Sequence, residues 1–155
     1  MSDTDEVEYA GFWVRLGAFL IDTVLLMVII LPLLMAFYGE GYLEGDTVIH
    51  GPMDFMISWV APAVVTIAFW IIKQATPGKM ALRLRIVDAR TGAAPGTGQC
   101  IGRYFAYFVS MIPLFLGILW VAFDSRKQGW HDKLAGTVVV RRKADRVARF
   151  EGASR

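Results

Sequence analysis

Two charged side chains interrupt a long apolar stretch near the beginning of the chain. Arg15 and Asp22 are the only charged residues between positions 12 and 37, and they stand seven residues apart. In a helix this spacing is nearly two turns, so both side chains lie on one face. A carboxylate at the centre of a bilayer costs about 2.5–3.5 kcal/mol on insertion scales. Asp22 is therefore predicted either to pair within the protein or to bind a proton or small cation, and Arg15 is expected to anchor at the interface or form a salt bridge.

A second polar cluster follows the last apolar stretch and contains Asp124, His131 and Asp132. We expect one of the two aspartates to approach Arg15 and form a charge-assisted pair. Arg103, at the head of the preceding apolar stretch, is a further member of this predicted charge network. His131 is a candidate pH sensor because histidine titrates near neutral pH, and an ordinary surface histidine is the alternative. The spacing matches no metal-ligand pattern, so no metal site is predicted.

The other residues with chemical potential match no catalytic motif. The segment TPGK at positions 76–79 lacks the upstream glycine and the following Ser or Thr of a phosphate loop. No serine stands in a nucleophile elbow, and Cys100, the single cysteine, has no evident base beside it. The sequence therefore predicts a protein that is not an enzyme and carries no cofactor.

Three long apolar segments must position these residues, and they indicate an α-helical integral membrane protein. Hydrophobic residues make up 55% of the 155-residue chain. The apolar segments cover about residues 12–37, 55–72 and 104–123. About 20 helical residues cross the hydrocarbon core, so the first two segments are predicted to be full transmembrane helices. Residues 1–10 form a polar, acidic tail without the basic region of a signal peptide, so the first helix is expected to remain in the mature protein.

The charge distribution predicts the orientation in the membrane. Of the 16 Lys and Arg residues, all except Arg15 lie at or after Lys73, and the segment 38–54 contains none. Because cytoplasmic segments carry an excess of Lys and Arg, we expect residues 38–54 outside and both termini in the cytoplasm, in the plasma (inner) membrane. The basic tail 143–155 is expected to bind anionic lipids at the cytoplasmic face rather than nucleic acid.

The prediction for the third apolar segment depends on two β-rich segments that flank it. Residues 82–88 alternate apolar and basic side chains, and residues 137–142 are rich in valine, so we expect them to pair as a small two-stranded element on the cytoplasmic face. A full crossing at 104–123 would separate the two strands. Pro113 and Gly117 lie near its middle, so a re-entrant hairpin is favoured, although 20 residues are also long enough for a full span.

These residues, taken in order, resemble the RDD family of bacterial and archaeal membrane proteins. The resemblance is carried by Arg15 and Asp22, the segment TPGKMALRLRIVD, Arg103 and the segment QGWHDKLAGTVVV, and it spans about residues 11–142. It implies a small polytopic membrane protein with a proposed role in transport, which for some members is sodium/proton exchange. It also implies that Arg15 and Asp22 are the first two signature residues. The third is Asp124 or Asp132, and the sequence leaves that choice open.

Two functions are compatible with this sequence. In the first, Asp22 exchanges a proton for a small cation such as Na⁺ while Arg15 competes for or orients the carboxylate, and a homo-oligomer completes the pathway. In the second, the protein is a membrane adaptor whose basic inner face docks a partner or anionic lipid, and the Arg and Asp residues hold the fold together.

Overall fold

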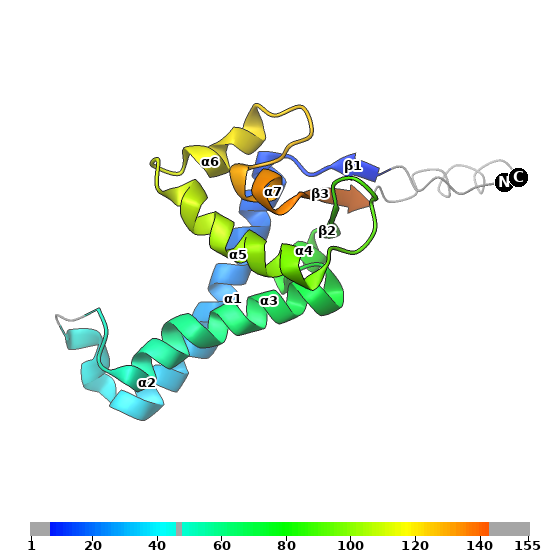
Figure 1. The fold of residues 1–155 in the computed structure, drawn as a ribbon. Coiled ribbons are helices and arrows are strands. Elements are labelled where there is room, and N and C mark those ends of the chain that lie inside the picture. Colours follow the sequence, from blue (N-terminus) through cyan, green and yellow to red (C-terminus); the bar gives the residue numbers. More distant parts are fainter. Residues whose placement is uncertain (1–6, 46–47, 143–155) are drawn as a thin grey trace, which may run out of the picture.

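Two long helices dominate the computed structural model, which describes residues 7–45 and 48–142 (Figure 1). Helix α1 covers Phe12–Tyr38, and the chain turns back through a 3₁₀ helix at Glu40–Glu44. The second long helix covers Pro52–Lys73. It consists of α2 (Pro52–Phe55), a π-helical turn (Met56–Val60) and α3 (Ala61–Lys73). Both helices are long and apolar enough to cross a membrane, and few of their side chains are buried within the protein, as expected for helices that face lipid.

Two prolines shape the second helix. Pro52 stands at its first turn, where a missing N–H and a fixed φ cost nothing. Pro62, the second residue of α3, comes shortly after the π-helical turn and has no N–H to offer the carbonyl of Ser58. The wider turn at Met56–Val60 is the local adjustment expected ahead of such a residue.

The third apolar segment is a bent pair of helices. Helix α5 covers Thr97–Met111, and α6 (Leu116–Leu119) continues into a 3₁₀ turn at Trp120–Ala122, at an angle of 113° to α5. Pro113 cannot continue the helix, and Leu114 and Phe115 take left-handed φ values of 51° and 63°. The helix therefore breaks where the sequence places its proline. Helix α5 begins at Thr97, earlier than the expected position 104. The apolar run did not reveal its first turns, because they are amphipathic rather than apolar.

The sheet has three strands rather than the expected two. Strands β2 (Leu84–Asp88) and β3 (Thr137–Arg142) pair antiparallel, as predicted, with Ile86 opposite Val139. Strand β1 (Val7–Tyr9) adds to the other side of β3, so the order is β1-β3-β2. Part of the expected polar tail over residues 1–10, Val7–Tyr9, thus forms a strand whose residues are exposed. Three residues carry too little alternation to be recognised, and the free edge of β3 induces the strand. The basic tail 143–155 and residues 1–6 lie outside the described residues.

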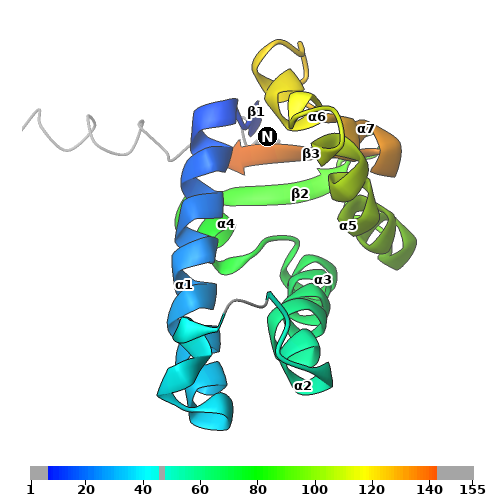
Figure 2. The ribbon, with the colours of Figure 1, turned by 90° about the vertical axis from the view of Figure 1, so that its left-hand side faces the viewer.

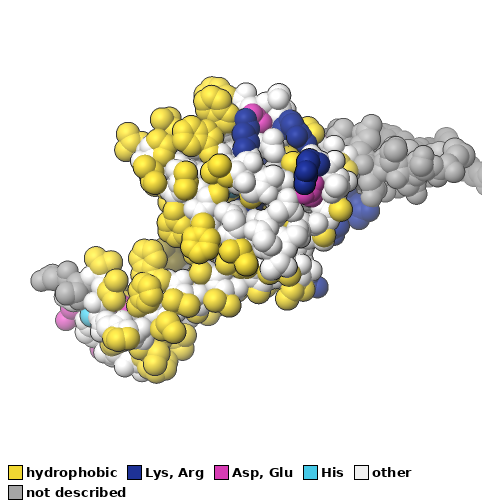
Figure 3. All heavy atoms as spheres, in the orientation of Figure 1, with side chains coloured by type: hydrophobic (Ala, Val, Ile, Leu, Met, Phe, Trp, Pro, Cys, Tyr) yellow, Lys and Arg dark blue, Asp and Glu magenta, His cyan; other side chains and the backbone are white. Residues whose placement is uncertain are grey.

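A small core joins the sheet to the long helices. Its buried members come from α1, α3, α5 and the sheet: Ala10, Ala18, Trp70, Leu84, Ile86, Cys100 and Val139. The sheet lies beside the first turns of α1, and the short helix α4 (Pro77–Ala81) lies further along α1, beside the middle of that helix (Figure 2). Helix α7 (Trp130–Ala135) packs on α5. Hydrophobic side chains cover the long helices and the α5–α6 end of the molecule, whereas the Lys and Arg side chains on the same face gather toward the sheet (Figure 3).

Candidate functional site

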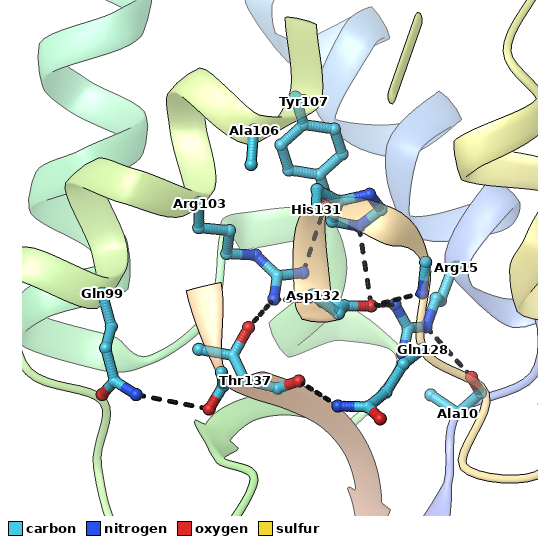
Figure 4. A network of polar contacts seen from close by, with 12 residues as sticks. Ala10, Arg15, Gln99, Arg103, Ala106, Tyr107, Gln128, His131, Asp132 and Thr137 are labelled. Carbon is cyan, nitrogen blue, oxygen red and sulfur yellow. Dashed lines mark hydrogen bonds and ion pairs between the residues drawn. The ribbon is translucent and has the colours of Figure 1, made fainter. Parts of the chain in front are cut away.

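The carboxylate of Asp132 lies at the centre of a buried charge network (Figure 4). It accepts hydrogen bonds from Nη1 of Arg15 at 2.5 Å and from Nη1 of Arg103. A third bond comes from the backbone N–H of Gly129 at 3.1 Å. Asp132 is the third residue of α7 and bonds back to the residue that caps this helix, so the local turn aims its side chain inward. The carboxylate thereby joins α1, α5 and α7.

The two arginines find further acceptors inside the protein. Arg15 also donates from Nε to the carbonyl of Ala10 at 3.0 Å and from Nη2 to the carbonyl of Lys127 at 2.6 Å. Arg103 is fully buried and donates to the hydroxyl of Thr137 at 2.6 Å. Burial alone would raise the pKa of Asp132, but the guanidinium groups of Arg103 and Arg15 hold it well below its usual range. The carboxylate therefore stays ionised, with two cations beside it.

His131 is part of the interior rather than of the surface. It is 2% exposed, and its ring stacks on Tyr107 with 3.9 Å between centroids. Burial lowers its pKa to about 3, so the ring is neutral near pH 7 even though its Nε2 lies 3.6 Å from Oδ2 of Asp132. A ring that stays neutral near pH 7 does not change its charge there, so this environment argues against pH sensing near neutrality. His131 is also not the ordinary surface histidine that was the alternative.

Asp22 belongs to a separate site on the same helix. The hydroxyl of Thr76 donates to its Oδ2 at 2.5 Å, and the backbone N–H of Gly78 donates to its Oδ1 at 2.7 Å. Both donors follow the end of α3 and open α4, so the carboxylate binds the start of that short helix. A side chain at position 78 would collide with Asp22 and with the carbonyl of Ala18, which explains the glycine. Asp22 is thus held at the level where α3 ends.

The expected set of charged residues therefore divides. Arg15, Arg103 and Asp132 meet, whereas Asp22 bonds to Thr76 and Gly78, and Asp124 pairs elsewhere. Asp124 pairs with Nζ of Lys133 at 2.5 Å and caps the turn that follows it. Of the two aspartates that the sequence left open, Asp132 is the partner of Arg15, because the turn after Asp124 uses the oxygens of Asp124 locally.

A second buried carboxylate, which the sequence reasoning missed, lies at the far end of the long helices. Asp54 is 1% exposed and accepts from the hydroxyls of Tyr42 at 2.9 Å and Ser58 at 2.7 Å, and from the backbone N–H of His50 at 2.8 Å. Its own N–H donates to the hydroxyl of Tyr38. The spacing of Asp54 and Ser58 on one helix face was the available signal. Within residues 7–45 and 48–142, no group of three or more His, Cys, Asp or Glu side chains is arranged to hold a metal.

Together these features define a class of protein. Two helices long enough to cross a membrane, a bent third apolar segment and a buried charge network that ties them to a small sheet form an α-helical membrane protein. The model of the RDD family matches residues 9–136, and the chain belongs to that family.

The chain is also similar to individual proteins, one of which is named as a membrane protein. The chain is 31% identical to YxaI of Bacillus subtilis over 147 residues, which covers 84% of this chain and 96% of YxaI. It is 29% identical to the membrane protein YteJ of Bacillus subtilis, over 87% of this chain and 82% of YteJ. It is 45% identical to RP437 of Rickettsia prowazekii over 75 residues, or 48% of this chain and 41% of RP437. No solved structure matches.

Proposed function

We propose that this protein is a membrane scaffold that holds a basic three-stranded sheet at the cytoplasmic face of the plasma membrane. The observation that carries the proposal is that both charged side chains of α1 are used within the protein. Arg15 donates to three acceptors, and Asp22 accepts from two donors. Charged groups engaged in this way stabilise one packing of the helices and leave no open ionic site.

The proposed topology places the N-terminus, the sheet and the C-terminus in the cytoplasm and residues 38–54 outside. Strands β2 and β3 stand on either side of the bent α5–α6 segment and pair with each other, so both ends of this segment lie together. The 113° bend and the Lys and Arg residues on both flanks support a re-entrant hairpin rather than a full crossing.

Cation exchange at Asp22 is the competing function. A bound Na⁺ needs several oxygen ligands, whereas one oxygen of Asp22 faces the N–H of Gly78, which cannot coordinate a cation. The hydroxyl of Thr76 is already turned to donate to the other oxygen. Exchange would therefore require both bonds to break in each cycle, and the geometry favours the scaffold.

The test uses the full chain reconstituted in proteoliposomes with a pH-sensitive dye inside and an imposed Na⁺ gradient. We expect no Na⁺-driven proton movement above that of empty liposomes. We also expect Asp22→Asn to lower stability by about 1.5–3 kcal/mol, because one charge-assisted bond is lost. Na⁺-dependent proton movement by the wild type that disappears in a folded Asp22→Asn variant would overturn the scaffold proposal.

A further inference from the structure

The sheet has one face that the core does not cover, and this face carries a groove of about 860 Å³. Its floor is formed by residues that share this face in the strand register, since Arg85 pairs with Val140 and Val87 with Val138. The opposite face carries Ile86 and packs into the core. The basic side chains that line the groove come from several separate elements: Lys73, Arg83, Arg85, Arg126 and Arg142.

Three basic residues at the rim of the groove form no ion pair with the described part of the chain. Lys73, Arg83 and Arg85 are exposed, and within the described part of the chain no carboxylate forms an ion pair with them. Asp88 is the acidic residue in the described lining. Its oxygens are taken by the side-chain amide of Gln99 at 2.7 Å and by the N–H groups of the turn that follows it. Among the described residues, Lys73, Arg83 and Arg85 are therefore available to an anionic ligand in the groove.

The groove begins where a membrane-crossing helix ends. Lys73 is the last residue of the Pro52–Lys73 helix and also lines the groove. Lipid phosphates lie just outside the hydrocarbon core, so they are the anions nearest to this rim. The floor adds apolar contacts from Val87, Val138 and Val140, and Met80 is exposed at the same rim. Basic side chains thus stand next to an apolar surface, a combination that suits a phosphate headgroup with the first carbons of its acyl chains.

We propose that this groove binds the phosphate headgroup of an anionic phospholipid from the cytoplasmic leaflet. Arg83 and Arg85 hold the phosphate oxygens through their guanidinium groups, and Lys73 adds a point charge at the membrane surface. The valine floor covers the glycerol and the start of the acyl chains. The inference rests on the proposed function, because it requires the sheet to lie on the cytoplasmic side.

The experiment measures lipid binding to the purified full chain in a neutral detergent. The probe is short-chain dioctanoyl phosphatidylglycerol, and dioctanoyl phosphatidylcholine is the neutral comparison. A basic residue near an anionic lipid surface contributes about 1 kcal/mol, or about fivefold in affinity, so Arg83→Gln combined with Arg85→Gln should weaken phosphatidylglycerol binding about 30-fold. Arg90→Gln combined with Arg141→Gln is the matched control, because both side chains are exposed and neither lines the groove. The control should change affinity less than threefold.

Several results would overturn the inference. Equal loss of binding in both double variants would mean a diffuse surface-charge effect, and equal binding of phosphatidylcholine would mean that no headgroup is recognised. Displacement of the lipid by inorganic phosphate at the same concentration would assign the site to free phosphate. Stronger displacement by polyglutamate would assign it to an acidic protein. Thermal unfolding checks that each variant is folded. Because binding is measured in detergent, its failure leaves the ion-flux result of the scaffold test untouched.

Discussion

Replacement of Asp132 by Asn tests whether the charge network holds the fold together. The substitution keeps the shape of the side chain but removes the negative charge between Arg15 and Arg103. One carboxylate oxygen becomes an NH₂ group and faces a guanidinium donor. Arg103 is 0% exposed, so its charge has no water to replace the lost partner. Breaking a buried pair in this way costs about 3–5 kcal/mol. For a chain of this size the loss corresponds to a fall in Tm of about 6–20 °C.

The buried cysteine provides the assay. Cys100 is 1% exposed and is the single cysteine, so a thiol-reactive fluorophore labels it as the chain unfolds. Asp124→Asn is the matched control: its partner Lys133 is 44% exposed at the side chain and such pairs contribute about 0–1 kcal/mol, while the amide oxygen of Asn can still accept from the N–H groups of the following turn. Equal Tm values for the two variants would refute the reasoning. Replacing Arg15, Arg103 and Asp132 together by Met, Met and Leu should recover part of the loss, because no unpaired charge remains buried.

Three further outcomes are expected. His131 has a pKa of about 3 in the folded state, below its unfolded value, so the free energy of unfolding falls as the pH drops from about 6.5 towards 3. The slope of this fall approaches about 1.4 kcal/mol per pH unit, and His131→Phe should remove it when Tm is measured against pH. Gly78→Ala should cost about 1–3 kcal/mol, because the added methyl meets Asp22 and the backbone of α1, whereas Gly102→Ala meets no atom within 4 Å and should be neutral or stabilising. Asp54→Asn should lower stability by about 1–3 kcal/mol in the same thiol assay, because its three donors lose a charged acceptor.

Each of these expectations has an outcome that contradicts it. A pH profile between 4.5 and 6.5 that is the same in the wild type and in His131→Phe would mean that the buried ring does not control the slope. Equal stability of the two alanine variants would mean that α4 has room to move away from α1. An unchanged Tm for Asp54→Asn would mean that the cluster at the far end of the long helices is not a structural anchor.

Much of the architecture could be predicted because it depends on local composition. The two long helices follow from long runs that are almost wholly apolar, which only a helix can carry through lipid, since every backbone group must be bonded internally. The break in the third segment follows from Pro113, which removes one N–H wherever it stands. The pairing of β2 with β3 follows from alternation and from the need of each strand for a partner. These features require no knowledge of distant contacts.

The bonding of the charges could not be predicted in this way. Arg15 and Asp22 share a helix face, yet each bonds a different segment, at 117 and 54 residues' distance along the chain. The choice between Asp124 and Asp132 as the partner of Arg15 depends on how the turn between them folds. In the same way, Val7–Tyr9 becomes a strand because β3 has an open edge. By itself the sequence determined that these charges lie in an apolar chain and must be compensated. Only the tertiary structure decided which groups compensate them, because hydrogen bonds and ion pairs act over a few ångströms and depend on where separate elements meet.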